Sequence, residues 1–254
     1  MVADSLVLGI LRATGKRPKA QPDDFIGLID HTRPPSQLFI GAQKIEPRQI
    51  DYERLKTWID FCQDKHKGLC LSPNAKPPPK FRVIDITTRR VVQAPKECNY
   101  VALSYVWGNP ADSTNSGFSC VVEDSMIVCK ALGYRYLWVD QDCNDQGNPN
   151  VLEKQVNAMD AVYGNAHLTI IAAAGEDSAY GLPGVGLRPR VTQQLISLGK
   201  TTFIRTFTHL QETLKASKWA TRGWTFQEGV LSTRKLIFTD HQVAFQCNGM
   251  HCSE

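Results

Sequence analysis

Two acidic residues stand where the pattern of the sequence would let them act on a bound ligand. Asp140 ends the apolar segment YLWVD, and acids at the carboxyl ends of parallel strands border the crevice where ligands bind. Glu228 follows Trp224 by four positions, so a helix would put carboxylate and indole on one face, where they can hold a flat cationic ring. A plainer alternative stays open: Asp140 caps its loop, and Glu228 pairs with Arg222 or Arg234 while Trp224 fills the core.

A second group of residues has the types that bind metals. Cys62, His66 and Cys70 recur every four positions, which would align three soft ligands if one helix continued past Gly68. A fourth ligand would come from Cys98, Cys247, His251 or Cys252. The C-x2-C knuckle of structural zinc sites is missing, however, and cysteine is among the residues most often buried. We therefore expect no bound metal, although the first three residues leave the question open.

Composition is that of an ordinary globular protein. The chain has 254 residues, of which 42% are hydrophobic and 21% charged, with a net charge of +4. Its basic segments GKRPKAQPDD and NAKPPPKFR are broken by proline and carry few interleaved aromatic residues, so we expect linkers and no nucleic-acid partner. Eight scattered cysteines suit reduced thiols, and no apolar run reaches the roughly 18 residues of a membrane helix. We expect a soluble, cytoplasmic protein with no membrane contact.

Three parts are predicted along the chain. Residues 1–47 contain five prolines and little periodicity, which indicates a loosely ordered arm. Residues 48–99 form a lead-in packed on the core, with one amphipathic helix ending near Gly68, followed by a hairpin made of FRVIDI and RVVQAP. Residues 100–254 form the main domain.

The main domain alternates between strand and helix patterns. Strands YVALSYVW, RYLWVD and HLTIIAAA are separated by helices expected at 123–132 and 152–163, which predicts an α/β fold with a mostly parallel sheet and helices on both faces. The glycine-rich loop after them lacks the spacing of a dinucleotide fingerprint and is interpreted as turns. Strands QLISLG and TTFIRTF, a helix at 219–230, and a C-terminal hairpin of KLIFTD and VAFQC follow.

Five ordered blocks resemble the fungal heterokaryon incompatibility (HET) domain: YVALSYVWG, LGYRYLWVDQDCNDQ, EKQVNAMDAVYGNAHLTIIAAAG, GLPGV, and SKWATRGWTFQEGVLSTRKLIF with QVAFQC. The resemblance covers roughly residues 100–247, and the preceding helix and FRVIDI resemble the usual lead-in. One departure is Asn144, where the family usually shows an aliphatic residue. The resemblance implies a fungal protein of non-self recognition that triggers growth arrest or cell death.

HET domains are in turn distantly similar to TIR domains, which have a flavodoxin-like sheet. Some TIR domains cleave the glycosidic bond of NAD with a helix glutamate four positions after a tryptophan, and Trp224 and Glu228 match that spacing. The likeness implies Glu228 as the catalytic residue, NAD as the candidate substrate, and neither a cofactor nor a metal. The implied substrate-binding residues are Ser104, Tyr105, Trp107, Gly108, Asp140 and Trp224.

Two functions of different classes follow from the resemblance. In the first, the domain is an NAD(P) glycohydrolase that becomes active when it self-associates. In the second, it is a non-catalytic signalling module that works by homotypic contact and recruits an unidentified fungal death effector. The two functions differ in their need for Glu228: cell death requires this glutamate in the first and does not require it in the second.

Overall fold

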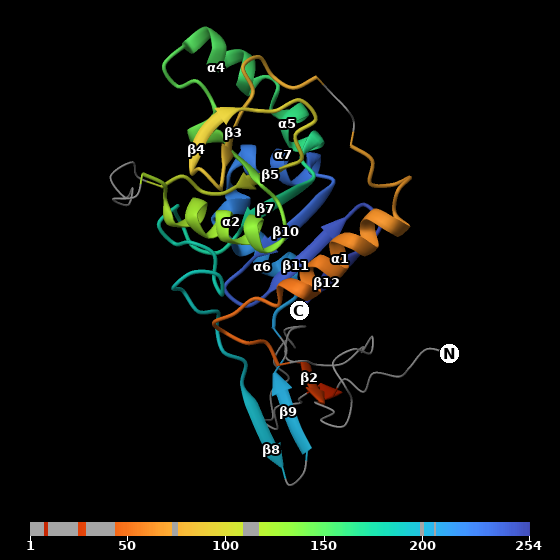
Figure 1. Ribbon diagram of the computed structural model, residues 1–254. Helices are drawn as coiled ribbons and strands as arrows, with labels where there is room; N and C mark the ends of the chain where they lie inside the picture. Colours follow the sequence, from red (N-terminus) through yellow and green to blue (C-terminus); the bar gives the residue numbers. More distant parts are fainter. Residues whose placement is uncertain are drawn as a thin grey trace.

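Four parallel strands form the centre of an eight-stranded sheet (Figure 1). The computed structural model describes residues 8–9, 25–28, 44–72, 76–108, 117–198, 201–205 and 207–254. The central strands lie in the order β6-β5-β7-β10. Their bounds are β5 (Tyr100–Ser104), β6 (Tyr136–Val139), β7 (Leu168–Ala172) and β10 (Arg234–Phe238). Every residue of β5 and β7 is buried, as expected for strands covered on both faces.

Antiparallel strands complete the sheet at both edges. On one side β3 (Arg82–Asp85) pairs with β6 and with β4 (Arg90–Gln93). On the other side β11 (Val243–Cys247) pairs with β10 and with β12 (His251–Ser253). The predicted α/β class and both predicted hairpins are thus confirmed, with parallel pairing in the centre and antiparallel pairing outside.

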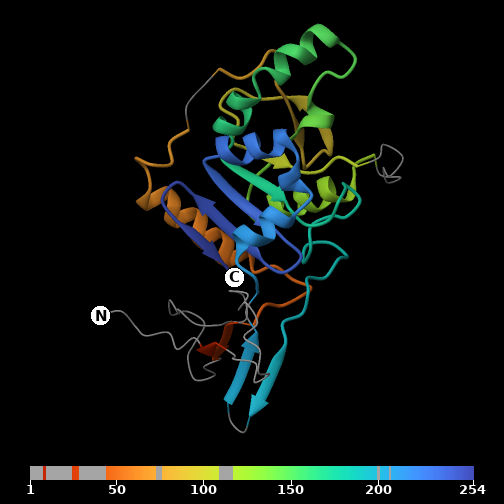
Figure 2. The same ribbon diagram turned by 180° about the vertical axis from the view of Figure 1, so that it is seen from behind.

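Helices cover both faces of the sheet. Strands β6 and β7 flank β5 on opposite sides, so right-handed connections to them must run over opposite faces. Helices α1 and α2 lie on one face, whereas α5, α6, η2 and α7 lie on the other (Figures 1 and 2). The bounds are α1 (Tyr52–Lys65), α2 (Cys120–Ala131), α3 (Asp140–Cys143), α4 (Pro149–Val156), α5 (Met159–Asn165), α6 (Leu210–Ala216), η2 (Trp219–Thr221) and α7 (Gly223–Leu231).

Two predicted helices are each divided in the structure. The helix expected at 152–163 is α4 followed by α5, with a turn at Asn157 and Ala158. The helix expected at 219–230 is η2 followed by α7, because Arg222 between them is extended, with φ −97° and ψ 128°. The Thr225 hydroxyl donates to the Arg222 carbonyl at 2.8 Å and stabilises this break. Helices α3 and α6 were not predicted.

A second, four-stranded sheet projects from the main body (Figure 1). Its hairpin of β8 (Leu195–Leu198) and β9 (Thr201–Arg205) was predicted as two strands, and β9 pairs with β2 (Phe25–Leu28), which pairs with β1 (Leu8–Gly9). The rest of the predicted arm up to residue 43 lies outside the described residues. Among the helices that the structure describes, none is long and apolar enough to span a bilayer.

The glycine-rich loop packs closely on helix α2. Gly181 has φ +76°, and a Cβ there would lie 2.5 Å from Asp124 Oδ2. The Leu182 N–H donates to that same oxygen at 2.7 Å. Burial raises the pKa of Asp124, and the Leu182 bond opposes the rise. The loop therefore encloses a buried carboxyl group, and its glycine spacing is explained by packing.

We expect Gly181→Ala to lower the free energy of unfolding by about 3 kcal/mol, because a left-handed backbone and a close contact with Asp124 act together. Gly133→Ala is the matched control: Gly133 has φ +84° but nothing within 4 Å of its Cβ position. It should cost only about 1 kcal/mol. Urea unfolding of both variants measures the difference, and equal losses would contradict the packing role.

Candidate active site

Ser104 lies at the carboxyl end of the central strand β5 and connects it to two helices. Its hydroxyl donates to Glu228 Oε2 at 2.5 Å and accepts from the indole Nε1 of Trp219 at 2.7 Å. The alternation of β5 turns Ser104 toward the face that carries η2 and α7. All three side chains are buried. A continuous chain of hydrogen bonds therefore joins η2, β5 and α7.

Glu228 is a buried acid, and some of its surroundings raise the pKa of its carboxyl group while others lower it. Burial raises the pKa of its carboxyl group, while the Ser104 hydrogen bond and the positive charge of Arg222 partly oppose the rise. The two arginines that the sequence offered as ion-pair partners bind elsewhere. Arg222 donates to the Tyr105 carbonyl at 3.1 Å, and Arg234 donates to the Cys70 carbonyl at 2.9 Å. The carboxylate is thus not locked onto an arginine.

Glu228 also borders a pocket of about 450 Å³. The Glu228 side chain itself is only 6% exposed, whereas that of Trp224, on the same helix, is 58% exposed. Tyr163 of α5 contributes to the wall, with its hydroxyl donating to the Leu103 carbonyl at 3.1 Å. The remaining wall residues are Val156, Asn157, Met159, Asp160, Val230 and Leu231. The pocket therefore joins an accessible aromatic ring to a buried carboxylate, as the four-residue spacing predicted.

The other predicted residues form a separate group beside this pocket. Trp107 donates through Nε1 to Asp140 Oδ2 at 2.8 Å, and the Gln141 N–H donates to Asp140 Oδ1 at 2.8 Å. The Tyr105 hydroxyl donates to Gln141 Oε1 at 3.0 Å, and Tyr105 is buried. Ser104 thus bonds Glu228, and Tyr105, Trp107 and Asp140 are joined in a second network. Of the residues predicted to bind substrate, only Trp224 lines the pocket together with Glu228.

Electrostatics couple the two groups. Burial raises the pKa of Asp140 to about 7, and the nearby negative charge of Glu228 adds to the rise. The hydrogen bonds from Gln141 and Trp107 act against it, since they favour the carboxylate. Ionisation of either acid, Asp140 or Glu228, therefore opposes ionisation of the other. Coupled acids of this kind are common at functional sites.

Gly108 has a packing role in the loop that follows β5. Its φ is +78°, and a Cβ there would lie 2.6 Å from the Cβ of Asp177. Only glycine allows the loop after β5 to approach the loop after β7 this closely. The residues that follow it, 109–116, lie outside the described residues.

Two residues of the site were not predicted from the sequence. Trp219 and Tyr163 both lie in segments that resemble the family, but neither has a spacing that points to Glu228. Their contacts depend on how β5, α5 and α7 pack together. Spacing along the chain therefore does not identify either residue as part of the site.

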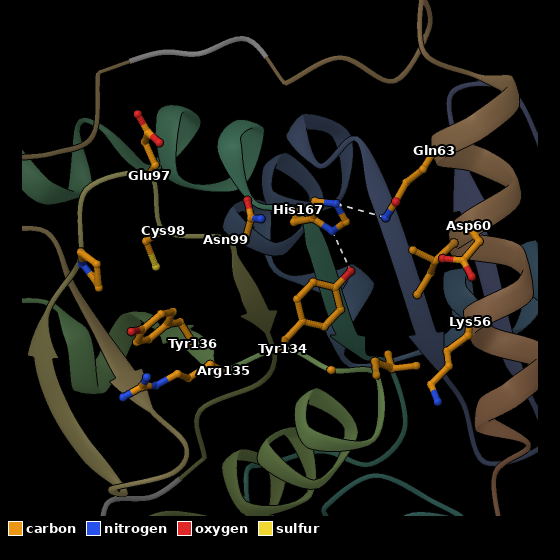
Figure 3. A pocket seen from close by; sticks show the side chains of 14 residues that line it. Lys56, Asp60, Gln63, Glu97, Cys98, Asn99, Tyr134, Arg135, Tyr136 and His167 are labelled. Atoms are coloured by element: carbon orange, nitrogen blue, oxygen red, sulfur yellow. Dashed lines mark hydrogen bonds between the residues drawn. The ribbon is translucent and has the colours of Figure 1, made fainter.

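A second pocket, also about 450 Å³, opens at the amino ends of the central strands (Figure 3). Figure 3 shows His167 pointing toward Tyr134 and Gln63, with Tyr134 Oη 2.6 Å from Nδ1 and Gln63 Nε2 3.2 Å from Nε2. Burial lowers the pKa of His167, and the charge of Arg234 adds to this effect. The Glu228 pocket is lined by α4, α5, the turn between them and α7, but its carboxylate bonds Ser104 at the carboxyl end of β5. Ligands of open parallel sheets bind at that end of the strands, so the Glu228 pocket is the better candidate.

Comparison with known proteins gives one family match. The model described as Heterokaryon incompatibility protein (HET) matches residues 100–228, just over half of the 254-residue chain. The matched segment begins with β5 and ends at Glu228, so it contains the whole hydrogen-bonded chain described above. No curated protein and no solved structure matches the sequence.

The Ser104 bond gives a pH-dependent prediction. Because the folded-state pKa of Glu228 is raised, its contribution to stability falls as pH rises above its ordinary value of 4.5. Ser104→Ala removes a bond that lowers this pKa, so the fall extends to higher pH. We expect a loss in unfolding free energy of about 2 to 3 kcal/mol near pH 8 and a smaller loss near pH 5.

Ser125→Ala is the matched control for this experiment. Ser125 is buried in α2 and its hydroxyl donates to the Val121 carbonyl at 2.6 Å, so no ionisable group is involved. Its loss should be about 1 kcal/mol and independent of pH. Chemical unfolding at the two pH values measures both. A Ser104→Ala loss that does not change with pH would contradict the proposed support of the Glu228 carboxylate.

Proposed function

The chain belongs to the heterokaryon incompatibility (HET) family, and on that basis we propose that it acts in fungal non-self recognition by cleaving a nicotinamide dinucleotide at Glu228. The observation that carries the proposal is the pocket in which an exposed indole, that of Trp224, stands beside the Glu228 carboxylate. Its volume of about 450 Å³ falls in the usual range for small-molecule sites, about 300 to 1,000 Å³. Cleavage of NAD would deplete the cell of this dinucleotide and stop cell growth.

The proposed substrate suits the chemistry of this pocket. The nicotinamide ring of NAD is flat and positively charged, and it would stack on the accessible face of Trp224. An ionised Glu228 would accept hydrogen bonds from the ribose hydroxyls. Ser104 holds Oε2 of that carboxylate in place. Trp224 therefore selects the ring, and Glu228 orients the sugar.

The proposed reaction requires neither a metal nor a second nucleophile. The bond between ribose C1′ and the nicotinamide nitrogen breaks, and its electron pair neutralises the ring nitrogen, so neutral nicotinamide leaves. The positive charge that develops on the ribose is stabilised by the Glu228 carboxylate. Water then adds to C1′ and releases one proton to solvent. Because burial raises the pKa of Glu228, the rate should increase with pH as this group ionises.

One observation favours a second candidate function, a non-catalytic signalling module. Among the described side chains of helix α7, large apolar groups are exposed around the pocket, namely Trp224, Val230 and Leu231. Exposed apolar groups that lie together often mark a surface that another protein covers. Self-association on activation would bury them. Under this alternative, a death effector would be recruited and Glu228 would serve only to hold α7 on the sheet.

We expect Glu228→Gln to reduce nicotinamide release from NAD by at least about 100-fold, because an amide cannot stabilise the developing positive charge as a carboxylate does. The full chain is fused to an inducible dimerisation domain, and nicotinamide is quantified by chromatography with and without the dimeriser. Glu212→Gln is the control, since Glu212 is exposed on α6 and pairs with Lys215. It should retain the wild-type rate.

Two outcomes would contradict the enzymatic proposal. One is a dimerised wild type that releases no nicotinamide. The other is a Glu228→Gln variant that is as active as the wild type. If Glu228→Gln still arrests growth of the host cell while Val230→Lys, on the exposed surface of α7, abolishes arrest, the signalling module is the correct function.

A further inference from the structure

Four metal-binding side chains converge from two segments of the chain, residues 62–70 and the end of β11. Cys62, His66, Cys70 and Cys247 each offer one ligand atom, and these four atoms all lie within 4.8 Å of one another. Tetrahedral zinc, with bonds of about 2.3 Å to sulfur and about 2.0 Å to nitrogen, places its ligand atoms roughly 3.5 to 3.8 Å apart. The four side chains therefore need to close by no more than about 1 Å to surround an ion.

Local structure explains how these residues meet. Helix α1 ends at Lys65, close to the predicted end near Gly68, so the three residues are not aligned along one continuous helix. Instead the N–H groups of Leu69 and Cys70 both donate to the His66 carbonyl, at 2.9 and 2.8 Å, and this turn folds Cys70 back toward Cys62. The fourth ligand comes from the end of β11. The site is thus built by a turn and a long-range contact, which the four-residue spacing alone did not predict.

The imidazole of His66 is held with a ring nitrogen toward the sulfur atoms. Its Nδ1 lies 3.4 Å from Cys247 Sγ. The backbone of Gly249 lies against the ring, because a Cβ at that position would be 2.7 Å from His66 Cγ. The ring of Phe61 meets the imidazole edge-on, with centroids 5.7 Å apart. A glycine at the turn after β11 therefore makes room for the histidine.

Polar groups around the cluster suit sulfur that carries negative charge. Arg234 Nε lies 3.3 Å from Cys62 Sγ, and the Gly249 N–H donates to Cys247 Sγ at 3.4 Å. Three thiolates with one Zn²⁺ carry a net charge of −1, which the Arg234 guanidinium would balance. Donors of this kind orient and stabilise the ligands of metal sites. Packing of neutral cysteines alone would not require them.

We propose that Cys62, His66, Cys70 and Cys247 bind one structural zinc ion. Four protein ligands leave no open position, which is typical of zinc that stabilises a fold. All four residues lie outside the matched segment 100–228. The ion would fasten the lead-in helix α1 to strand β11, and binding it would release three thiol protons. This site is independent of the Glu228 pocket and of the proposed cleavage of NAD.

The proposal is tested by the metal content of the full chain, purified under reducing conditions after growth with zinc. The wild type should carry about one zinc per chain, and Cys247→Ser and His66→Gln should each carry less than about a tenth of that amount. Cys98→Ser is the matched control, because Cys98 is a half-buried free cysteine outside the cluster. It should keep the wild-type content.

A second measurement serves where the ligand variants do not fold. X-ray absorption at the zinc edge of the wild type should show three sulfur ligands and one nitrogen ligand, and removal of zinc by a chelator should lower the melting temperature. A wild type without stoichiometric zinc would overturn the proposal. A disulfide within the cluster after reducing purification, or equal zinc in Cys247→Ser and Cys98→Ser, would overturn it as well.

Discussion

A buried carboxylate at the end of the central strand is the constraint on which the rest of this structure depends. Moving an ionised carboxylate from water into a protein interior without hydrogen-bond partners costs several kcal/mol. Glu228 must therefore be supported by groups within the protein. Ser104 provides that support from β5, and Trp219 in turn fixes the hydroxyl of Ser104. One strand, one short 3₁₀ helix and one α-helix are therefore held in a fixed arrangement by a single polar chain.

The order of the strands explains why this polar chain forms where it does. Strands β5 and β6 are parallel neighbours, so the loops that leave them reach the same end of the sheet. In the arrangement β6-β5-β7-β10, β5 is flanked by the two strands that follow it, which is where ligands bind in open α/β sheets. Asp140 enters from the end of β6, and Ser104 from the end of β5. Helix α7 brings Glu228 to them before the chain enters β10. The opposite end of the sheet holds His167, and the two acids that line its pocket, Asp60 and Glu97, lie on opposite sides of it (Figure 3).

The sequence allowed the central strands and both edge hairpins to be predicted, because their apolar runs and turns are local signals. The division of the helix expected at 152–163 was not predictable, since no proline or glycine marks the turn at Asn157 and Ala158. Spacing on one helix also predicted that Trp224 and Glu228 share a pocket. Trp219 and Tyr163 each hydrogen-bond to a residue of β5 that is distant from them in sequence. Only the packed fold therefore identifies these two residues as part of the site.

The polar residues at the two ends of the sheet form different kinds of contact. At the carboxyl end, the matched segment begins with the strand of Ser104 and ends at Glu228, two residues that bond each other, so the family pattern contains the complete support of the carboxylate. At the amino end of β10, Arg234 faces the sulfur of Cys62 and pairs in register with Cys247. That cluster joins the lead-in helix to the C-terminal hairpin, and neither belongs to the matched segment. The cluster and the support of the Glu228 carboxylate are therefore built from separate parts of the chain.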